Sequence, residues 1–181
     1  GSTGRFTKSG SSSPIEREFV SEQAAAEKRF EARSIQQGIA WTLFRPTMIY
    51  GGGSDLNVVF IGSFIRRYRF FPIPRGAKGL RQPVHADDLA AACIAALTNE
   101  PTFGRAYNLG GGERLIYPDL VGRIFAALKM RRRVLILPVW VCRLMVQIAR
   151  KIPRYGFVNA DMVERTFVDL VADHADAQRD F

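Results

Sequence analysis

Apolar positions along the chain follow helical spacing and strand spacing in turn. Good helix formers fill residues 17–37 without Gly or Pro, and Gly38 closes the run. Residues 39–50 then form a nearly continuous apolar stretch, interrupted at Arg45-Pro46 and followed by glycines. A helix followed by such a strand is typical of an α/β unit whose parallel strand is buried on both faces.

The same alternation continues to the end of the chain. An apolar stripe predicts a helix at 57–69, and residues 80–85 read as extended before a helix that we expect Asp87 or Asp88 to cap. The remaining expected elements are an extended Pro/Gly loop at 70–79, short strands on either side of the glycines at 110–112, a helix from Pro118 through Leu128, a short strand at 133–139, helices at 139–151 and 159–172, and a helix start at the end of the chain.

Composition narrows the classes of partner. Twenty-six Lys and Arg against seventeen Asp and Glu give a formal charge of +9, which suits nucleic acid, an anionic membrane surface or phosphorylated small molecules. Without an RNA-binding aromatic motif, zinc-finger spacing or heptads, we expect no nucleic acid partner. Cys93 and Cys142 have no CxxC pattern, so we expect two buried thiols in a reducing, cytoplasmic compartment. His85 and His174 are the only histidines, so we expect no metal site.

One apolar stretch, residues 134–149, is flanked by basic residues. Arg131 to Arg133 precede it and Arg150-Lys151 follow it. The stretch is too short to span a bilayer and contains Pro138 and Arg143, so we expect no transmembrane helix. It predicts either a buried helix of a globular domain or a helix that lies in a membrane interface, giving the protein a peripheral membrane contact.

Three stretches, in this order, carry a family resemblance. They are "WTLFRPTMIYGGG" from Trp41, "LRQPVHADDLAAA" from Leu80 and "AYNLGGGERLIY" from Ala106. The ordered set resembles the extended and atypical short-chain dehydrogenase/reductases, the NAD-dependent epimerase/dehydratase superfamily, in their C-terminal portion. The resemblance implies the last part of a Rossmann-type doubly wound parallel sheet plus a small, mostly helical substrate domain.

The resemblance also implies NAD or NADP as cofactor and a division of the chain. Residues 1–56 would be the C-terminal part of the Rossmann-like domain. Residues 57–181 would hold substrate-domain elements interleaved with a returning Rossmann strand. No G-x-G-x-x-G opens a strand–helix unit here, so we expect the dinucleotide-binding first half to be missing from this sequence.

This sequence has other residues at the two positions of the family's catalytic Tyr-x-x-x-Lys pair. The best match to its motif runs from Phe19, which takes the Tyr position, and Gln23 takes the Lys position. Phe has no proton to transfer, and Gln has no charge to lower a pKa, but its amide can donate hydrogen bonds to ribose hydroxyls. Ser2 or Thr3 would fill the family's Ser position. Plain helix packing is the alternative interpretation of Phe19 and Gln23.

Further site residues follow from position in the family motifs. The resemblance places Arg45, Pro46 and Thr47 at the nicotinamide and Asn57 near the substrate. Arg81 matches an Arg that meets a nucleotide-sugar phosphate, the alternative being a solvated loop arginine. His85 is the last substrate-side candidate, although a structural histidine bonded to backbone is the favoured interpretation.

Two functions remain open from the sequence. The first is an NAD(P)-dependent enzyme that acts on a nucleotide-sugar-like or other small polar substrate, with a degenerate Tyr-x-x-x-Lys pair. The second is a non-catalytic NAD(P)-binding or assembly protein, at a membrane or a respiratory complex. The sequence leaves the oligomeric state and the choice between NAD and NADP open.

Overall fold

The computed structural model describes residues 3, 14–53, 55 and 57–181. By contacts the chain divides into two compact units. Unit 1 comprises Gly1–Gly52, Gln82–Arg114 and Leu170–Phe181, and unit 2 comprises Gly53–Arg81 and Leu115–Asp169. Each unit is therefore built from segments that are distant in sequence. The assignment of 1–56 and 57–181 to a Rossmann-like and a substrate domain stays a prediction.

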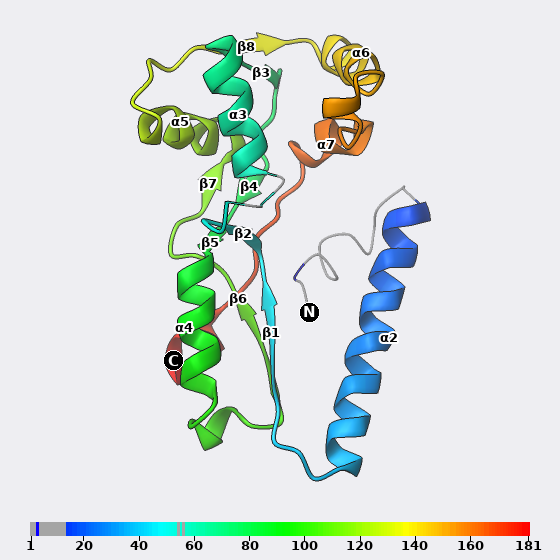
Figure 1. Ribbon diagram of the computed structural model, residues 1–181, viewed down its shortest axis with the longest axis vertical. Helices are drawn as coiled ribbons and strands as arrows, with labels where there is room; N and C mark the ends of the chain where they lie inside the picture. Colours follow the sequence, from blue (N-terminus) through cyan, green and yellow to red (C-terminus); the bar gives the residue numbers. More distant parts are fainter. Residues whose placement is uncertain (1–2, 4–13, 54, 56) are drawn as a thin grey trace. The chain divides into compact units, whose positions relative to one another are not determined.

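Unit 1 is organised around parallel strands. Strand β1 (Thr42–Pro46) pairs in parallel with β6 (Arg105–Leu109), and β2 (Met48–Tyr50) pairs in parallel with β5 (Pro83–His85). Helix α2 (Pro14–Gln36) lies on one side of the β1–β6 pair and α4 (Ala86–Ala96) lies on the other (Figure 1). A short 3-10 turn, Glu100–Thr102, connects α4 to β6. Parallel strands between helices are the arrangement that the apolar stretch at 39–50 predicted.

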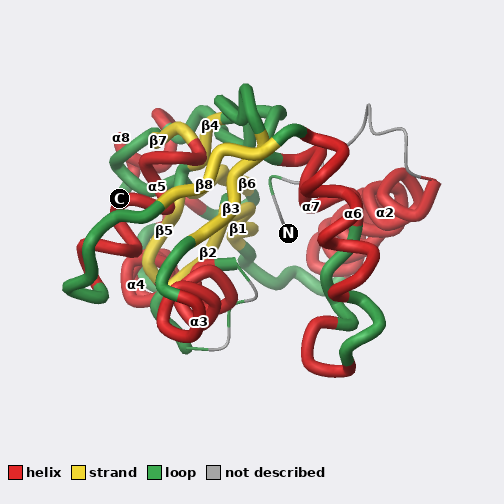
Figure 2. Tube along the Cα trace, turned by 90° about the horizontal axis from the view of Figure 1, so that it is seen from above, coloured by secondary structure: helices red, strands yellow, loops and turns green. Residues whose placement is uncertain are grey.

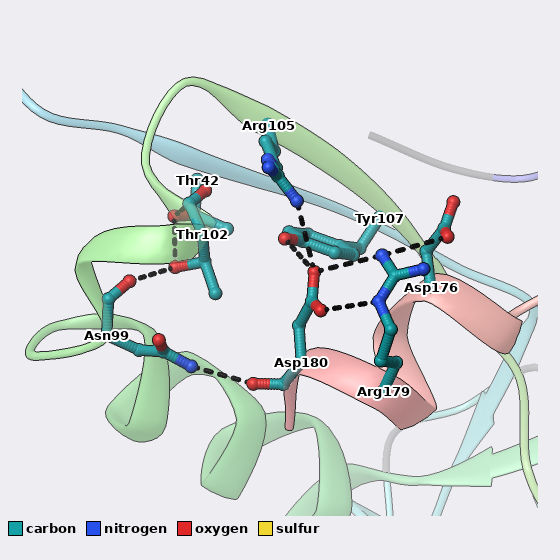
Figure 3. Close-up of polar contacts among 8 residues, drawn as sticks. All are labelled: Thr42, Asn99, Thr102, Arg105, Tyr107, Asp176, Arg179 and Asp180. Carbon is teal, nitrogen blue, oxygen red and sulfur yellow. Dashed lines mark hydrogen bonds and ion pairs between the residues drawn. The ribbon is translucent and has the colours of Figure 1, made fainter.

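The last helix, α8 (Ala175–Asp180), packs against β6 in unit 1. Tyr107 and Leu109 of β6 form a buried cluster with Ala177 of α8. The Tyr107 hydroxyl donates a 2.7 Å hydrogen bond to Oδ2 of Asp180, and Arg179 Nε donates to the Oδ1 of the same carboxylate at 3.0 Å (Figure 3). Both polar and apolar contacts thus hold the end of the chain onto the sheet.

Within its described residues, unit 2 combines two strand pairs with four α-helices and one 3-10 turn. Strand β3 (Phe71–Pro74) pairs in parallel with β8 (Val134–Leu137), and β4 (Leu80–Arg81) pairs antiparallel with β7 (Leu115–Ile116). Its helical segments are α3 (Val58–Tyr68), α5 (Tyr117–Ala127), α6 (Val139–Ala149), α7 (Ala160–Arg165) and the 3-10 turn Pro153–Tyr155. Helices α6 and α7 lie side by side (Figure 2), joined by the ion pair between Arg143 and Glu164.

The predicted α/β class is confirmed, and so are most of the expected elements, but the loop expected at 70–79 contains a strand. Pro72 and Pro74 argued against a strand because proline has no N–H to donate. In the structure the N–H groups of Phe71 and Arg75 donate to β8, at Arg133 O and Leu137 O. The prolines occupy the alternate positions, so β3 forms its pairing without their donors.

Three further expectations from the sequence are wrong. His85, and not Asp87 or Asp88, is the N-cap of α4, since its Nδ1 accepts the Asp87 N–H at 3.2 Å. The helix expected at 159–172 ends at Arg165, because the following residues are held to β4 by backbone hydrogen bonds such as Gly79 N–H to Thr166 O. Cys93 is exposed, whereas Cys142 is buried as expected.

Asp180 should make the docking of α8 sensitive to acid. Hydrogen bonds from Arg179 and Tyr107 lower the pKa of Asp180. A folded-state pKa below the unfolded value contributes stability above about pH 4, which is lost as the pH falls through the folded pKa. We expect Asp180→Asn to lower thermal stability at pH 7 and to weaken its dependence on pH between about 4 and 2. Thermal melts across this range would measure both effects.

The exposed Asp88 of α4 supplies the matched control. Asp88→Asn should leave both the stability at pH 7 and its acid dependence close to those of the parent. An equal change in the two variants would contradict a specific role for Asp180.

Candidate functional site

The carboxyl end of β1 gathers the positions that the resemblance assigns to the nicotinamide. The N–H and Oγ1 of Thr3 both donate to Pro46 O at 3.1 Å, and Thr3 is buried. The next residue, Thr47, donates its hydroxyl to Gln82 O and its N–H to Leu109 O. Because the ends of parallel strands in such sheets are where ligands bind, this edge is the first candidate site. Ser2, the other candidate for the family's Ser position, lies outside the described residues.

An ion pair ties α2 to this end of β1. Arg45 Nε and Nη2 approach the same oxygen of Glu27, at 3.0 and 2.9 Å. Both side chains are largely removed from solvent, Glu27 more than Arg45. Charge-assisted pairs of this kind fix geometry as well as contribute energy. The pair therefore sets how α2 lies against the strand that ends at Pro46.

Gln23 and Phe19 lie one and two turns before Glu27 on α2. The three residues are spaced by four, so they share one face of the helix. Gln23 is half-buried, and its Oε1 is buried without a hydrogen-bond partner. Phe19 is 51% exposed. The Phe19 ring is thus exposed to solvent in this chain. The buried amide oxygen of Gln23 can accept a hydrogen bond.

Asn108 and Gln82 complete the polar environment of this edge. Asn108 is the register partner of Arg45, and its Oδ1 is a second buried oxygen without a partner, while its Nδ2 donates to Asp173 O. Gln82 is fully buried and its amide is fully used: Nε2 donates to Gly111 O and meets His174 Nδ1, and Oε1 accepts Ala172 N–H.

Sequence reasoning missed Glu27, Asn108 and Gln82 as parts of this edge. A signal for Glu27 was present, because it lies four residues after Gln23 and so falls on the helix face that carries Phe19 and Gln23. Only the strand register brings Asn108 beside Arg45. Gln82 carries no sequence signal, since a lone Gln before a proline is compatible with an exposed loop.

His85 occupies a structural position at the start of α4. Besides capping the helix, its ring lies edge-on to Tyr50, with centroids 5.0 Å apart. Gly51 has φ +99°, and a Cβ there would clash with the His85 ring, so this close approach requires glycine. These contacts agree with the favoured interpretation of His85 as a structural histidine. A substrate role for His85 stays a prediction.

Two of the glycines at 110–112 are also needed because other groups approach them closely. A Cβ at Gly110 would clash with the Gln82 side chain, and one at Gly111 would clash with Pro83 O. Tight packing of the strand ends thus accounts for two of these glycines without a bound phosphate.

Two substrate-side candidates belong to unit 2. Asn57 is exposed and precedes α3, and its side chain makes no cap hydrogen bond. Instead Oδ1 of Asp55 accepts the N–H of Val58 at 2.6 Å and caps the helix. The Asn57 side chain is therefore accessible, and its contact with substrate stays a prediction.

Arg81 is 4% exposed and bonded to backbone, so it is not the solvated loop arginine that was the alternative. Its Nη1 donates to Leu80 O and Val168 O, at 2.7 and 2.9 Å, and its Nη2 donates to Arg165 O. The guanidinium carbon also lies 5.5 Å from the ring centroid of Tyr117. These bonds hold residues 165–168 beside β4. Binding of a substrate phosphate by Arg81 stays a prediction.

Burial acts on both members of the Arg81–Tyr117 contact. It lowers the pKa of Arg81 and raises the pKa of Tyr117 to about 12. The backbone carbonyls around Arg81 replace water as partners for its charge. No group of three His, Cys, Asp or Glu that could hold a metal ion occurs among the residues that the structure describes.

Similar sequences include two plant proteins. One is the mitochondrial NADH dehydrogenase (ubiquinone) 1 alpha subcomplex subunit 9 of Arabidopsis thaliana, to which the chain is 28% identical over 145 residues. This alignment covers 74% of this chain and 36% of that protein. The chain is 28% identical over 123 residues to the chloroplast stem-loop binding protein of 41 kDa b of the same plant, with 66% and 32% covered. The chain thus spans about a third of the length of these relatives. No protein-family model matches the sequence.

Solved structures show the fold. UDP-glucose 4-epimerase from Thermotoga maritima superposes with a TM-score of 0.59 at 17% identity, over 86% of this chain and 44% of that one. UDP-glucose 4-epimerase from Thermus thermophilus, in complex with NAD, gives 0.55 at 19% identity over 66% and 41%. The chain resembles the C-terminal portion of the extended short-chain dehydrogenase/reductases in sequence and in fold. The resemblance proposed from the three sequence stretches is confirmed.

The residues at the end of β1 fit the nicotinamide side of a dinucleotide. Two buried amide oxygens without partners, on Gln23 and Asn108, are acceptors for which a ribose hydroxyl or a carboxamide is a suitable donor. The buried Thr3 lies next to Pro46, to whose carbonyl oxygen its hydroxyl donates. Close packing accounts for Gly51, Gly110 and Gly111, so these three glycines give no support for a pyrophosphate cradle here.

The Glu27–Arg45 pair should be the main polar contact that stabilises α2 on unit 1. Glu27→Ala removes the carboxylate and leaves the Arg45 charge in a largely dry site. Because breaking a buried pair costs about 3–5 kcal/mol, we expect a loss of about 3 kcal/mol in the free energy of unfolding. Urea unfolding, followed by circular dichroism, would measure it.

Glu31, one turn further along α2 and exposed, is the control. Glu31→Ala should stay within about 0.5 kcal/mol of the parent, and Glu27→Gln should fall between the two. A loss at Glu27 no greater than that at Glu31 would contradict the role of the pair.

Tyr117 should make unit 2 sensitive to alkali. The raised pKa means that the folded state keeps the phenol proton after the unfolded chain, whose tyrosines titrate near 10, has lost it. The stability is therefore full below about pH 10 and falls as the pH rises toward 12, by about 3 kcal/mol. We expect Tyr117→Phe to reduce this slope and Tyr50→Phe to leave it. Urea unfolding at several alkaline pH values tests this, and an unchanged slope in Tyr117→Phe would refute it.

Proposed function

We propose that this protein binds NAD or NADP with the nicotinamide at the carboxyl end of β1, and that it does so without the proton transfer of a Tyr-x-x-x-Lys pair. The observation that carries the proposal is Gln23: its amide oxygen is buried, lacks a partner and stands one turn from the Glu27–Arg45 pair. A neutral amide at this position can hold a ribose hydroxyl. It cannot assist ionisation of a phenol.

The chemistry of Phe19 supports a binding role. A phenyl ring offers no acid or base, and at 51% exposure it presents an apolar surface on the same helix face as Gln23. Such a ring can pack against a planar nicotinamide. When bound, the dinucleotide would supply hydride chemistry, but the described residues offer no phenol or ammonium in the family's positions to move the accompanying proton.

The alternative is an NAD(P)-dependent enzyme that acts on a nucleotide-sugar-like substrate. It is supported by the structural neighbours, which include UDP-glucose 4-epimerases and a dTDP-glucose 4,6-dehydratase in complex with NAD. Thr3 would then face substrate. Catalysis in that case would need a proton donor other than the residues at 19 and 23.

Calorimetry with the full chain that the gene encodes tests the proposal. Titration with NADH and NADPH should show binding of at least one of them, and Gln23→Ala should weaken it by three- to tenfold, as expected for one hydrogen bond. Gln36→Ala, at the exposed end of α2, should bind as the parent does. The absence of binding to either dinucleotide would overturn the proposal.

A gain-of-function variant separates the two candidate functions. Phe19→Tyr with Gln23→Lys should confer cofactor-dependent oxidation or reduction on a panel of sugar nucleotides, if the parent site binds but lacks its acid and base. General acid–base catalysis contributes about 10²–10⁴-fold, so the parent should show at most slow turnover. Robust turnover in the parent that survives Phe19→Ala and Gln23→Ala would favour the enzyme instead.

A further inference from the structure

The positive charge of the protein is concentrated in unit 2. This unit carries sixteen Lys and Arg against five Asp and Glu, a formal excess of eleven. Unit 1 carries ten against twelve, so it is slightly acidic. The formal charge of unit 2 is therefore more positive than the +9 of the whole chain, and unit 2 is the source of the positive electrostatic field. Such a field attracts an anionic surface or polymer.

Unit 2 also exposes an apolar helix face. Trp140, Leu144 and Ile148 of α6 are spaced by four and so lie on one face of the helix, and they are 67%, 47% and 56% exposed. On the same helix Cys142 is buried, which shows that α6 turns its other side to the protein. The exposed face is therefore distinct from the side that packs in unit 2.

Strand β8 extends the apolar surface next to α6 in sequence. Leu135 and Ile136 of β8 are exposed, Ile136 at 65%, and only Pro138 separates the strand from α6. Basic residues border both ends of this segment: Arg131 to Arg133 before β8 and Arg150-Lys151 after α6, all exposed. Continuing the spacing by helical geometry, Lys151 falls close to the line of Trp140, Leu144 and Ile148.

These features match one kind of partner. A helix of eleven residues is about 16 Å long, half of what is needed to cross a bilayer, and no described helix is long and apolar enough to do so. An apolar face with an exposed Trp and basic residues at its borders is what binds in the plane of an anionic membrane interface. Nucleic acid would use the charge, but it gives no role to aliphatic side chains such as Leu144 and Ile148.

We propose that the exposed face of α6, together with β8 and the basic residues that border them, docks this protein on the surface of a bilayer containing anionic lipids. Trp140, Leu144 and Ile148 enter the boundary between headgroups and acyl chains. Arg150 and Lys151 pair with lipid phosphates. Unit 1 has no excess of positive charge, and the dinucleotide site proposed at the end of β1 takes no part in this docking.

Vesicle sedimentation with the full chain that the gene encodes tests the proposal. Vesicles of phosphatidylcholine with about one third phosphatidylglycerol should sediment the protein, and vesicles of phosphatidylcholine alone should do so at least tenfold less. Trp140→Ser with Leu144→Ser should weaken binding to anionic vesicles by tenfold or more. Arg150→Glu with Lys151→Glu should weaken it to a similar extent and remove most of its dependence on salt.

Ile94 and Leu97 near the end of α4 give the matched control, because they are as exposed as the α6 residues but lie in unit 1. Ile94→Ser with Leu97→Ser should bind vesicles as the parent does, and circular dichroism should show every variant folded. Binding that is equal on neutral vesicles, unaffected by the α6 variants, or abolished by stoichiometric RNA would overturn the proposal. So would analytical ultracentrifugation showing that the α6 variants dissociate a dimer.

Discussion

The buried ion pair between Glu27 and Arg45 is the contact on which the candidate site depends. It joins one face of α2 to the end of β1. Gln23 lies one turn from Glu27 on the same helix face, and its Oε1 is buried. The strand register places Asn108 beside Arg45, and the Oδ1 of Asn108 is buried. Both retain an amide oxygen without a partner, so the edge is prepared for a ligand with donors.

The two units divide the chemistry of the chain between them. Unit 1 holds the parallel strands and the edge at the end of β1, where specific hydrogen bonds fix the Gln82 amide, while Gln23 and Asn108 each keep one amide oxygen without a partner. Unit 2 holds the positive charge and an apolar helix face that its own residues leave exposed. A dinucleotide suits the first and an anionic lipid surface suits the second, so the two proposals rest on different residues and fail independently.

The sequence predicted those features that depend on local pattern. Helix α2, the strand after it and the three family-like stretches are local, and the structure contains them. The sequence did not predict the features that depend on residues distant in the chain. Strand β3 forms because Phe71 and Arg75, and not the prolines, donate to β8. Arg81 is buried because carbonyls from residues 165 and 168, more than eighty positions away, surround it. In the candidate site, Phe19 and Gln23 could be located by motif, whereas the roles of Glu27 and Asn108 needed the packing of α2 and the strand register.

Hydrogen–deuterium exchange of the gene-encoded chain, with and without NADH or NADPH, tests the central claim most directly. Ligand at the carboxyl end of β1 predicts slower exchange in peptides that cover residues 20–30 and 42–50, where α2 and the strand end meet. Exchange in unit 2 peptides from α6 should not change. Binding of a dinucleotide that leaves residues 20–30 and 42–50 unaffected would contradict the site described for this protein.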